Sequence, residues 1–143
     1  MKNVSFIIIF LGTEKSFLLK LCIDAVKILQ MKSGDEVEKP KVLTMAPTAN
    51  AAMIVGGKTI ESALAINPKN KWNYVKASDE RQSNMKFLYE DIKVVFTDEI
   101  SMCGTNKLTV INFRMQDYSE GSNKIKFMGN RSFIACGDFR CVE

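Results

Sequence analysis

Four short apolar segments recur along the chain, and longer segments with helical periodicity separate them. The apolar segments cover residues 4–10, 42–45, 94–97 and 132–136. The first, VSFIIIF, is apolar without alternation, which is typical of a strand covered on both faces in a parallel sheet. The other three contain β-branched or aromatic residues and run into proline, acidic or glycine residues, where strands commonly end. We therefore predict four strands.

Helical periodicity marks the segments between these strands. We predict helices over residues 15–32, 49–55 and 59–66, from Ser78 or Asp79 to about residue 92, and from residue 105 to about 119. In the first helix the apolar positions at helical spacing are Leu18, Leu21, Cys22, Ala25, Ile28 and Leu29. Strands that alternate with helices imply an α/β fold in which right-handed crossovers connect one parallel sheet. No internal repeat suggests a second domain.

Composition fits one compact domain with a reducing, intracellular location. The 143 residues are 46% apolar, and the net charge of +4 is spread along the chain, so it permits a nucleic-acid partner without requiring one. The four cysteines form no CxxC pair and there is no histidine, which argues against a zinc site or a disulfide framework. The apolar N-terminal segment lacks the cleavage site of a signal peptide, and no segment is long enough to span a membrane.

Two adjacent carboxylates follow the third apolar segment. The sequence VVFT leads directly into Asp98 and Glu99, so a buried strand delivers acids to its carboxyl end, where open α/β sheets bind ligands. Paired acids are costly to hold there unless a cation or a reacting water lies beside them, and such a cation commonly accompanies a phosphate. The alternative is a solvated helix cap, because acidic residues are common where helices start.

The turn after the first strand partly matches the phosphate-binding pattern G-x-x-x-x-G-K-[S/T]. Lys15 and Ser16 match the phosphate-binding lysine and the magnesium-binding hydroxyl, but the pattern glycines fall on Ile9 and Glu14, which leaves Gly12 as the only glycine of the loop. Side chains restrict a backbone whose N–H groups would face phosphate, and the Glu14 carboxylate repels it. We therefore expect weak Mg-ATP binding. The alternative interpretation is an ordinary helix start after a buried strand.

Four segments carry a family resemblance when they are taken together. In chain order they are LGTEKSFL, VLTMAPTANAAMIVGGKTIESALAI, VVFTDEISMCGTNKLTVINFRM and FMGNRSFIACGDFR. In order and spacing they resemble the Pif-type (petite integration frequency) superfamily 1 DNA helicases, including the helicase part of Helitron-type transposons. The resemblance covers nearly the whole chain. It implies the N-terminal RecA-like motor domain, a P-loop NTPase fold, of an enzyme that hydrolyses ATP with magnesium to translocate on DNA and unwind it.

The resemblance also implies roles for individual residues. Those implied to bind ATP are Gly12, Thr13, Lys15 and Ser16. Ser16 and Asp98 would hold magnesium, and Glu99 would be the catalytic acid and base. Those implied to contact DNA are Thr48, Lys58 and Thr59.

Two positions depart from the family pattern. Cys141 stands where the family has a phosphate-sensing glutamine, and a thiol cannot copy the donor and acceptor of an amide. Glu61 stands where the family usually has a DNA-facing histidine, and an acid there weakens binding to a phosphate backbone. The family continues beyond the position of Glu143 into a second motor domain with an arginine finger. We therefore expect no unwinding by residues 1–143 alone.

The expected function is that of a helicase motor domain with roles in DNA repair, recombination and telomere maintenance. Its implied partners are ATP, magnesium and single-stranded or duplex DNA, without an obligate protein partner, in the nucleus or alternatively the mitochondrion. One alternative is a decayed fragment that keeps the fold and weak nucleic-acid binding, and another is a small P-loop kinase, against which the missing loop glycines argue. Trp72 and Tyr74 could stack on bases, but a surface loop with a half-buried tryptophan is the simpler interpretation.

Overall fold

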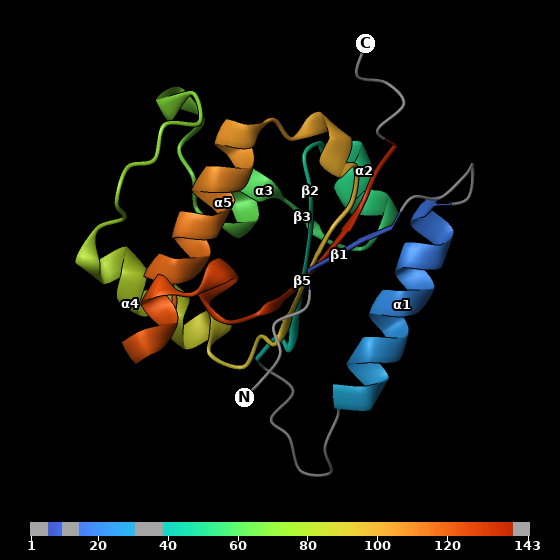
Figure 1. Ribbon diagram of the computed structural model, residues 1–143, viewed down its shortest axis with the longest axis horizontal. Helices are drawn as coiled ribbons and strands as arrows, with labels where there is room; N and C mark the ends of the chain where they lie inside the picture. Colours follow the sequence, from blue (N-terminus) through green and yellow to red (C-terminus); the bar gives the residue numbers. More distant parts are fainter. Residues whose placement is uncertain (1–5, 10–14, 31–38, 139–143) are drawn as a thin grey trace.

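The computed structural model describes residues 6–9, 15–30 and 39–138. Five strands form one sheet in the order β1-β5-β4-β2-β3. Figure 1 shows this sheet nearly edge-on at the centre of the molecule. They are β1 (Phe6–Ile9), β2 (Val42–Ala46), β3 (Lys58–Thr59), β4 (Val94–Thr97) and β5 (Ser132–Cys136). Every pair of neighbouring strands is parallel, so the predicted parallel α/β sheet is confirmed.

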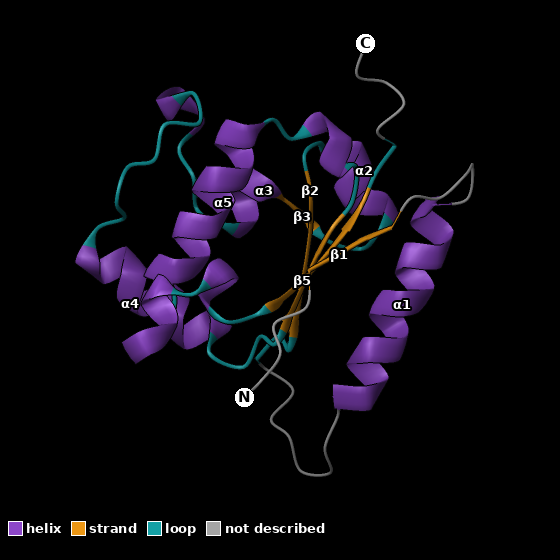
Figure 2. Ribbon diagram, viewed as in Figure 1, coloured by secondary structure: helices purple, strands orange, loops and turns teal. Residues whose placement is uncertain are grey.

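Helices cover both faces of this sheet. They are α1 (Lys15–Gln30), α2 (Ala49–Ile54), α3 (Ile60–Ala63), α4 (Asp79–Tyr89) and α5 (Thr105–Asp117). Figure 2 shows α1 on one side of the sheet and α3, α4 and α5 on the other. The larger apolar core lies between the sheet and α3 to α5, and a smaller one lies under α1. Within residues 6–9, 15–30 and 39–138, no helix is long and apolar enough to cross a membrane.

The predicted helix over residues 59–66 is wrong at its start, because a fifth strand precedes it. Lys58 and Thr59 pair with the end of β2, and the helix begins only at Ile60. Gly57 allows this approach, since a Cβ atom at that position would lie 2.5 Å from the carbonyl oxygen of Thr44 in β2. Two residues are too few to show a strand period, so the sequence pattern could not reveal β3.

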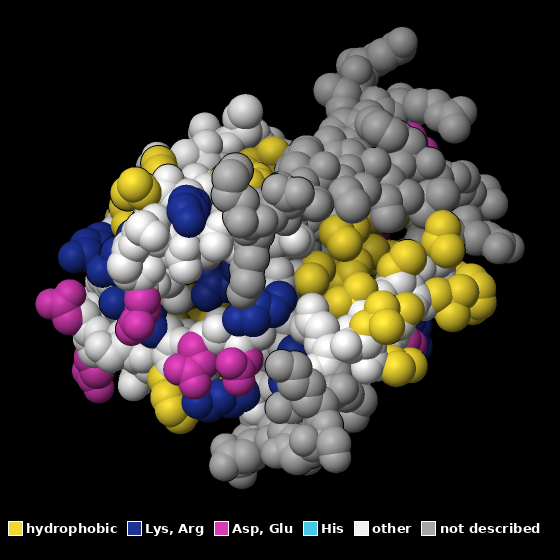
Figure 3. Space-filling model, turned by 60° about the horizontal axis from the view of Figure 1, so that its bottom comes forward, with side chains coloured by type: hydrophobic (Ala, Val, Ile, Leu, Met, Phe, Trp, Pro, Cys, Tyr) yellow, Lys and Arg dark blue, Asp and Glu magenta, His cyan; other side chains and the backbone are white. Residues whose placement is uncertain are grey.

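Helix α1 forms where the sequence predicts it but packs through a different stripe. Leu19 and Ile23 are buried against the sheet, with Cys22 and Val26 partly buried beside them. The large apolar side chains that stay exposed are Phe17, Leu18, Leu21, Ile28 and Leu29. They lie on the side of the molecule where Figure 3 shows hydrophobic side chains gathered. Most of the circumference of α1 is apolar, so periodicity alone could not select the face that packs.

Helices α4 and α5, which lie with α3 on the other face, begin where the sequence predicts them. The hydroxyl of Ser78 accepts a hydrogen bond from the backbone N–H of Arg81 at 3.4 Å, so the predicted cap of α4 is confirmed. In α5 the buried face contains Ile111 and Met115, as predicted. The helix ends at Asp117, slightly earlier than expected, and short 3₁₀ turns over Gly121–Ile125 and Phe127–Gly129 lead to β5.

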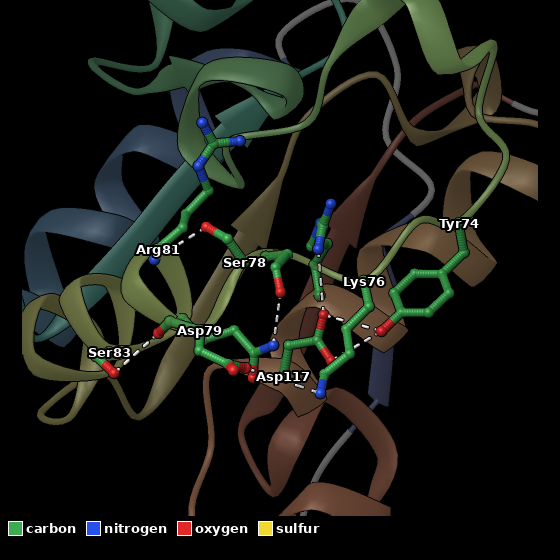
Figure 4. A network of polar contacts seen from close by, with 10 residues as sticks. Tyr74, Lys76, Ser78, Asp79, Arg81, Ser83 and Asp117 are labelled. Atoms are coloured by element: carbon green, nitrogen blue, oxygen red, sulfur yellow. Dashed lines mark hydrogen bonds and ion pairs between the residues drawn. The ribbon is translucent and has the colours of Figure 1, made fainter.

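The aromatic loop before α4 is attached to α5 rather than free. The Tyr74 hydroxyl donates to the Asp117 carboxylate at 2.9 Å and 3.0 Å, and Arg114 pairs with the same carboxylate at 3.2 Å (Figure 4). Trp72 is half-buried against the core, and the Lys107 ammonium lies 4.8 Å from the centre of its ring. The structure thus confirms the simpler interpretation, a surface loop with a half-buried tryptophan.

One buried arginine ties the ends of α4 and α5 to the start of β5. The Arg131 guanidinium donates to the carbonyl oxygens of Met115, Tyr118 and Tyr89 at 3.2 Å, 3.3 Å and 3.1 Å, and also to the Ser119 hydroxyl. Only 6% of Arg131 is exposed, and this burial lowers the pKa of its guanidinium. The carbonyl groups at helix C-termini have no partner within their own helix, so a cation there satisfies them and opposes their partial negative charge.

We predict that the domain loses stability between about pH 10 and pH 12. Burial, with Tyr118 nearby, raises the pKa of Tyr89 to about 12, and its hydroxyl donates to the carbonyl oxygen of Ala63. An unfolded tyrosine titrates near pH 10, so this contribution is complete below pH 10 and is lost as the pH rises through 12. A shift of two units corresponds to about 3 kcal/mol.

Urea unfolding at several alkaline pH values measures this loss. Tyr89→Phe keeps most of the packing but cannot ionise, so its free energy of unfolding should fall less steeply with pH than that of the parent chain. Parallel pH profiles for the two proteins would contradict the assignment to Tyr89.

Candidate functional site

Three of the predicted functional segments meet at one edge of the sheet. Strand β5 lies between β1 and β4, and all three run in the same direction. The start of α1, the acids after β4 and the residues after β5 therefore lie side by side at the carboxyl ends of neighbouring strands. Open α/β sheets bind their ligands at this edge.

Asp98 connects two of these segments through hydrogen bonds. Its carboxylate accepts one from the Ser16 hydroxyl at 2.9 Å and another from the backbone N–H of Glu99 at 2.8 Å. The backbone N–H of Asp98 donates to the carbonyl oxygen of Met45 at 3.0 Å, and the residue is only 1% exposed. The structure thus brings together the two residues predicted to hold magnesium, although 82 positions separate them in the sequence.

The spacing of these two oxygen atoms suits a magnesium ion. Magnesium takes six oxygen ligands in octahedral geometry at about 2.05 Å, which places neighbouring ligands about 2.9 Å apart. The hydroxyl oxygen of Ser16 and the carboxylate oxygen of Asp98 are 2.9 Å apart and belong to the ligand type that magnesium prefers. The two residues would therefore supply adjacent ligands without moving. Among the described residues, no group of three or more acidic, histidine or cysteine side chains forms a metal site of its own.

Glu99 differs from its neighbour in both backbone and environment. Its backbone is left-handed, with φ 50° and ψ 41°, a conformation that non-glycine residues adopt rarely and that clusters at functional sites. Its side chain is half-exposed, and the described part of the chain offers it no hydrogen bond or ion pair. Asp98 is buried and held by two hydrogen bonds, whereas the Glu99 side chain is half-exposed, so the two carboxylates are suited to different roles.

The predicted phosphate-binding loop is only partly within the described residues. Gly12, Thr13 and Glu14 lie outside them, and so does Cys141. Lys15 is the first residue of α1, directly before Ser16. Their predicted contacts with phosphate remain predictions.

The residues predicted to contact DNA lie at the same edge of the sheet, near strands β2 and β3. Strand β3 pairs with the end of β2, so Lys58 and Thr59 are close to the start of α2. The hydroxyls of Thr48 and Thr59 accept hydrogen bonds from the first turns of α2 and α3, at 3.3 Å and 3.2 Å. Each hydroxyl keeps its own proton to donate to a phosphate oxygen, and Lys58 is exposed. Glu61 is half-exposed in the first turn of α3, beside these candidates.

Cys103 lies near this region but has no sign of reactivity. The side chain is buried, and burial raises the pKa of its thiol. A thiol is a nucleophile only after it loses its proton, so Cys103 is a core residue of the turn after the acids.

The sheet order and the hydroxyl-carboxylate pair together define a class. A parallel sheet flanked by helices, with acids after β4 and a hydroxyl at the start of α1, is a RecA-like α/β fold. A sequence profile of PIF1-like helicases matches residues 2–143. The chain therefore belongs to the PIF1-like helicase family, and the predicted resemblance is confirmed.

Solved Pif1 helicases share the fold. Bacteroides Pif1 bound to ssDNA is 21% identical with a TM-score of 0.64, and the match covers 96% of this chain and 29% of that one. Bacteroides Pif1 in complex with ADP-AlF3 and ssDNA is 24% identical with a TM-score of 0.63, over 96% of this chain and 29% of that one. Candida albicans Pif1 is 24% identical with a TM-score of 0.62, over 95% and 29%.

This chain is much shorter than the solved Pif1 helicases that it resembles. The chain spans about 29% of the length of the solved helicases that it matches. No curated protein sequence matches it. The family and the fold are thus known, and the activity of these particular residues is a separate question.

Proposed function

We propose that this chain binds and hydrolyses ATP as a motor domain of a DNA helicase. The observation that carries the proposal is the hydrogen bond between Ser16 and Asp98, with Glu99 adjacent on the same turn. It joins a hydroxyl at the start of α1 to a buried acid at the end of β4, which is the arrangement that phosphate-loop enzymes use to hold a metal ion beside a nucleotide. The complex of a related Pif1 helicase with ADP-AlF3 supports it.

Each residue of the site has a defined part in this proposal. Lys15, with Gly12 and Thr13 before it, contacts the β- and γ-phosphates, and Ser16 and Asp98 hold magnesium. When bound, magnesium neutralises the charge that develops on the transferred phosphoryl group. Glu99 orients the attacking water and accepts its proton.

In this proposal a DNA strand binds at the same edge of the sheet, beside β2 and β3. Thr48 and Thr59 donate hydroxyl protons to backbone phosphates of a single strand, and Lys58 supplies a positive charge. The related Bacteroides Pif1 has been solved bound to ssDNA, which supports this part. We further propose that ATP turnover drives translocation and duplex unwinding for repair, recombination or telomere maintenance, in the nucleus or alternatively the mitochondrion.

Nucleotide binding tests the proposal most directly. We predict that the unmodified chain binds Mg-ATP weakly and that Glu14→Gly binds it more than tenfold tighter. A carboxylate about 4 Å from a phosphate charge, at an effective dielectric constant of about 20, costs up to about 4 kcal/mol, and half of that exceeds a tenfold change. Titration with a fluorescent ATP analogue measures the dissociation constant.

Two control variants separate the effect of the Glu14 charge from the effect of its side chain on the backbone. Glu14→Gln removes the charge but not the restriction on the backbone, so it should recover only part of the gain. Glu80→Gln makes the same change of charge at an exposed position of α4 and should have no effect. Tight binding by the unmodified chain, or no gain in Glu14→Gly, would contradict the prediction. Absence of Mg-ATP binding in every variant would favour the decayed fragment.

A further inference from the structure

A glycine at the end of β5 lies against the turn that follows the two acids. Gly137 comes directly after Cys136, the last residue of β5. A Cβ atom built on Gly137 would lie 2.8 Å from Cγ2 of Ile100, 2.9 Å from the backbone nitrogen of Ser101 and 3.1 Å from that of Ile100. Two of these three atoms belong to the backbone, so no change of rotamer relieves the contact. The strand end approaches the turn more closely than any side chain at position 137 permits.

The turn in question carries Glu99 at its start. Ile100–Met102 is a 3₁₀ turn, and Glu99 is its N-cap. The turn is closed by hydrogen bonds from the N–H of Met102 to the carbonyl of Glu99 at 2.9 Å and from the N–H of Cys103 to the carbonyl of Ile100 at 2.8 Å. A shift of Ile100 therefore moves the peptide group of Glu99 as well.

The left-handed backbone of Glu99 needs support of this kind. For a residue with a Cβ atom this conformation costs about 1 to 2 kcal/mol, and it persists only where the surrounding structure imposes it. Two contacts flank Glu99 here. On one side the Glu99 N–H donates to Asp98, and on the other Gly137 packs against the turn that follows.

We propose that Gly137 is a positioning residue for Glu99. Its missing side chain lets the end of β5 lie against Ile100 and Ser101, and this contact holds the Glu99 backbone in the conformation that places its carboxylate for water activation. The inference rests on the proposed function, in which Glu99 is the catalytic base. Because β5 lies between β1 and β4, the contact lies at the edge of the sheet where the start of α1 and the acids meet.

Amide hydrogen exchange of the whole chain tests the positioning without any activity. In Gly137→Ala, exchange of the Glu99, Met102 and Cys103 amides should become at least about tenfold faster, while exchange of the β4 amides is unchanged. Gly104→Ala is a matched control, because its Cβ atom would meet nothing within 4 Å and its φ of −65° suits any residue. Unchanged protection of the turn, or equal loss throughout the chain, would overturn the proposal.

Hydrolysis gives a second readout, measured in the tighter-binding Glu14→Gly background. With Gly137→Ala added, the dissociation constant for the ATP analogue should stay within about threefold while single-turnover hydrolysis falls at least about tenfold, because displacing a catalytic group by about 1 Å can cost 10²-fold. Equal hydrolysis with and without Gly137→Ala would overturn the role. If the background itself hydrolyses no ATP but the exchange pattern appears, the proposed function fails while the positioning of the turn stands.

A double variant tests the proposal in case Gly137→Ala does not fold. Ile100→Leu removes one of the three contacts, that with Cγ2 at 2.8 Å, and leaves the two backbone contacts at 2.9 Å and 3.1 Å. Gly137→Ala with Ile100→Leu should therefore be less destabilised than Gly137→Ala, so that it folds, and should still show the faster exchange at the turn. If the double variant also fails to fold, the contact is a requirement of the whole domain, and the proposal of a specific positioning role is overturned.

Discussion

Replacing Glu99 with glutamine is expected to lower ATP hydrolysis by about 10²- to 10⁴-fold and to leave Mg-ATP binding nearly unchanged. Glutamine has nearly the same shape as glutamate and can still orient a water molecule, but it cannot accept the proton of that water. Nearby Asp98 cannot replace it, because its carboxylate already accepts hydrogen bonds from Ser16 and from the Glu99 backbone. The loss should therefore appear in the rate and not in the affinity.

Single-turnover hydrolysis with the protein in excess over ATP measures this loss. The Glu14→Gly background is the suitable parent, and the fluorescent analogue gives the affinity in parallel. Glu80→Gln is the control for the change of net charge, because Glu80 is exposed in the first turn of α4. Hydrolysis that survives Glu99→Gln would remove Glu99 from the chemistry. A matching loss of affinity would instead place Glu99 among the groups that bind the nucleotide.

The second large effect concerns stability. Arg131→Met is expected to lower the free energy of unfolding by about 3 to 5 kcal/mol, because each buried carbonyl group left without its donor costs about 1 to 3 kcal/mol. Methionine fills much of the same space, but the carbonyl groups of Met115, Tyr118 and Tyr89 lose their shared donor inside the protein. A domain of this size is commonly stable by only about 5 to 15 kcal/mol, so the change removes a large part of the total.

Urea unfolding followed by circular dichroism measures this free energy. Arg131→Lys keeps the charge but reaches fewer acceptors, so its stability should lie between those of the parent and Arg131→Met. Arg81→Met is the matched control, because Arg81 is exposed on α4, and it should change the stability by less than about 0.5 kcal/mol. An equal loss for Arg81→Met and Arg131→Met would contradict the assigned role of the buried guanidinium.

The errors of the sequence prediction have a common physical origin. Strand β3 has only two residues and depends on how closely Gly57 approaches β2, which no local pattern records. The packing face of α1 was misplaced because its apolar residues surround most of the helix. Arg131 has no signal at all, since an arginine in a sequence is most often exposed. In each case the outcome depends on contacts with residues far away in the chain.

The class of the fold, the family and the residue types of the site follow from the amino-acid sequence alone. The apolar segments that precede Ser16, Asp98 and Glu99 are local patterns, and local patterns are visible in the sequence itself. The folded chain is needed to see that Ser16 donates to Asp98, that Glu99 has a left-handed backbone and that Gly137 packs against the turn beside it. Strand order and close packing set the distances between residues that are remote in sequence. These distances cannot be calculated from the spacing of the residues along the chain.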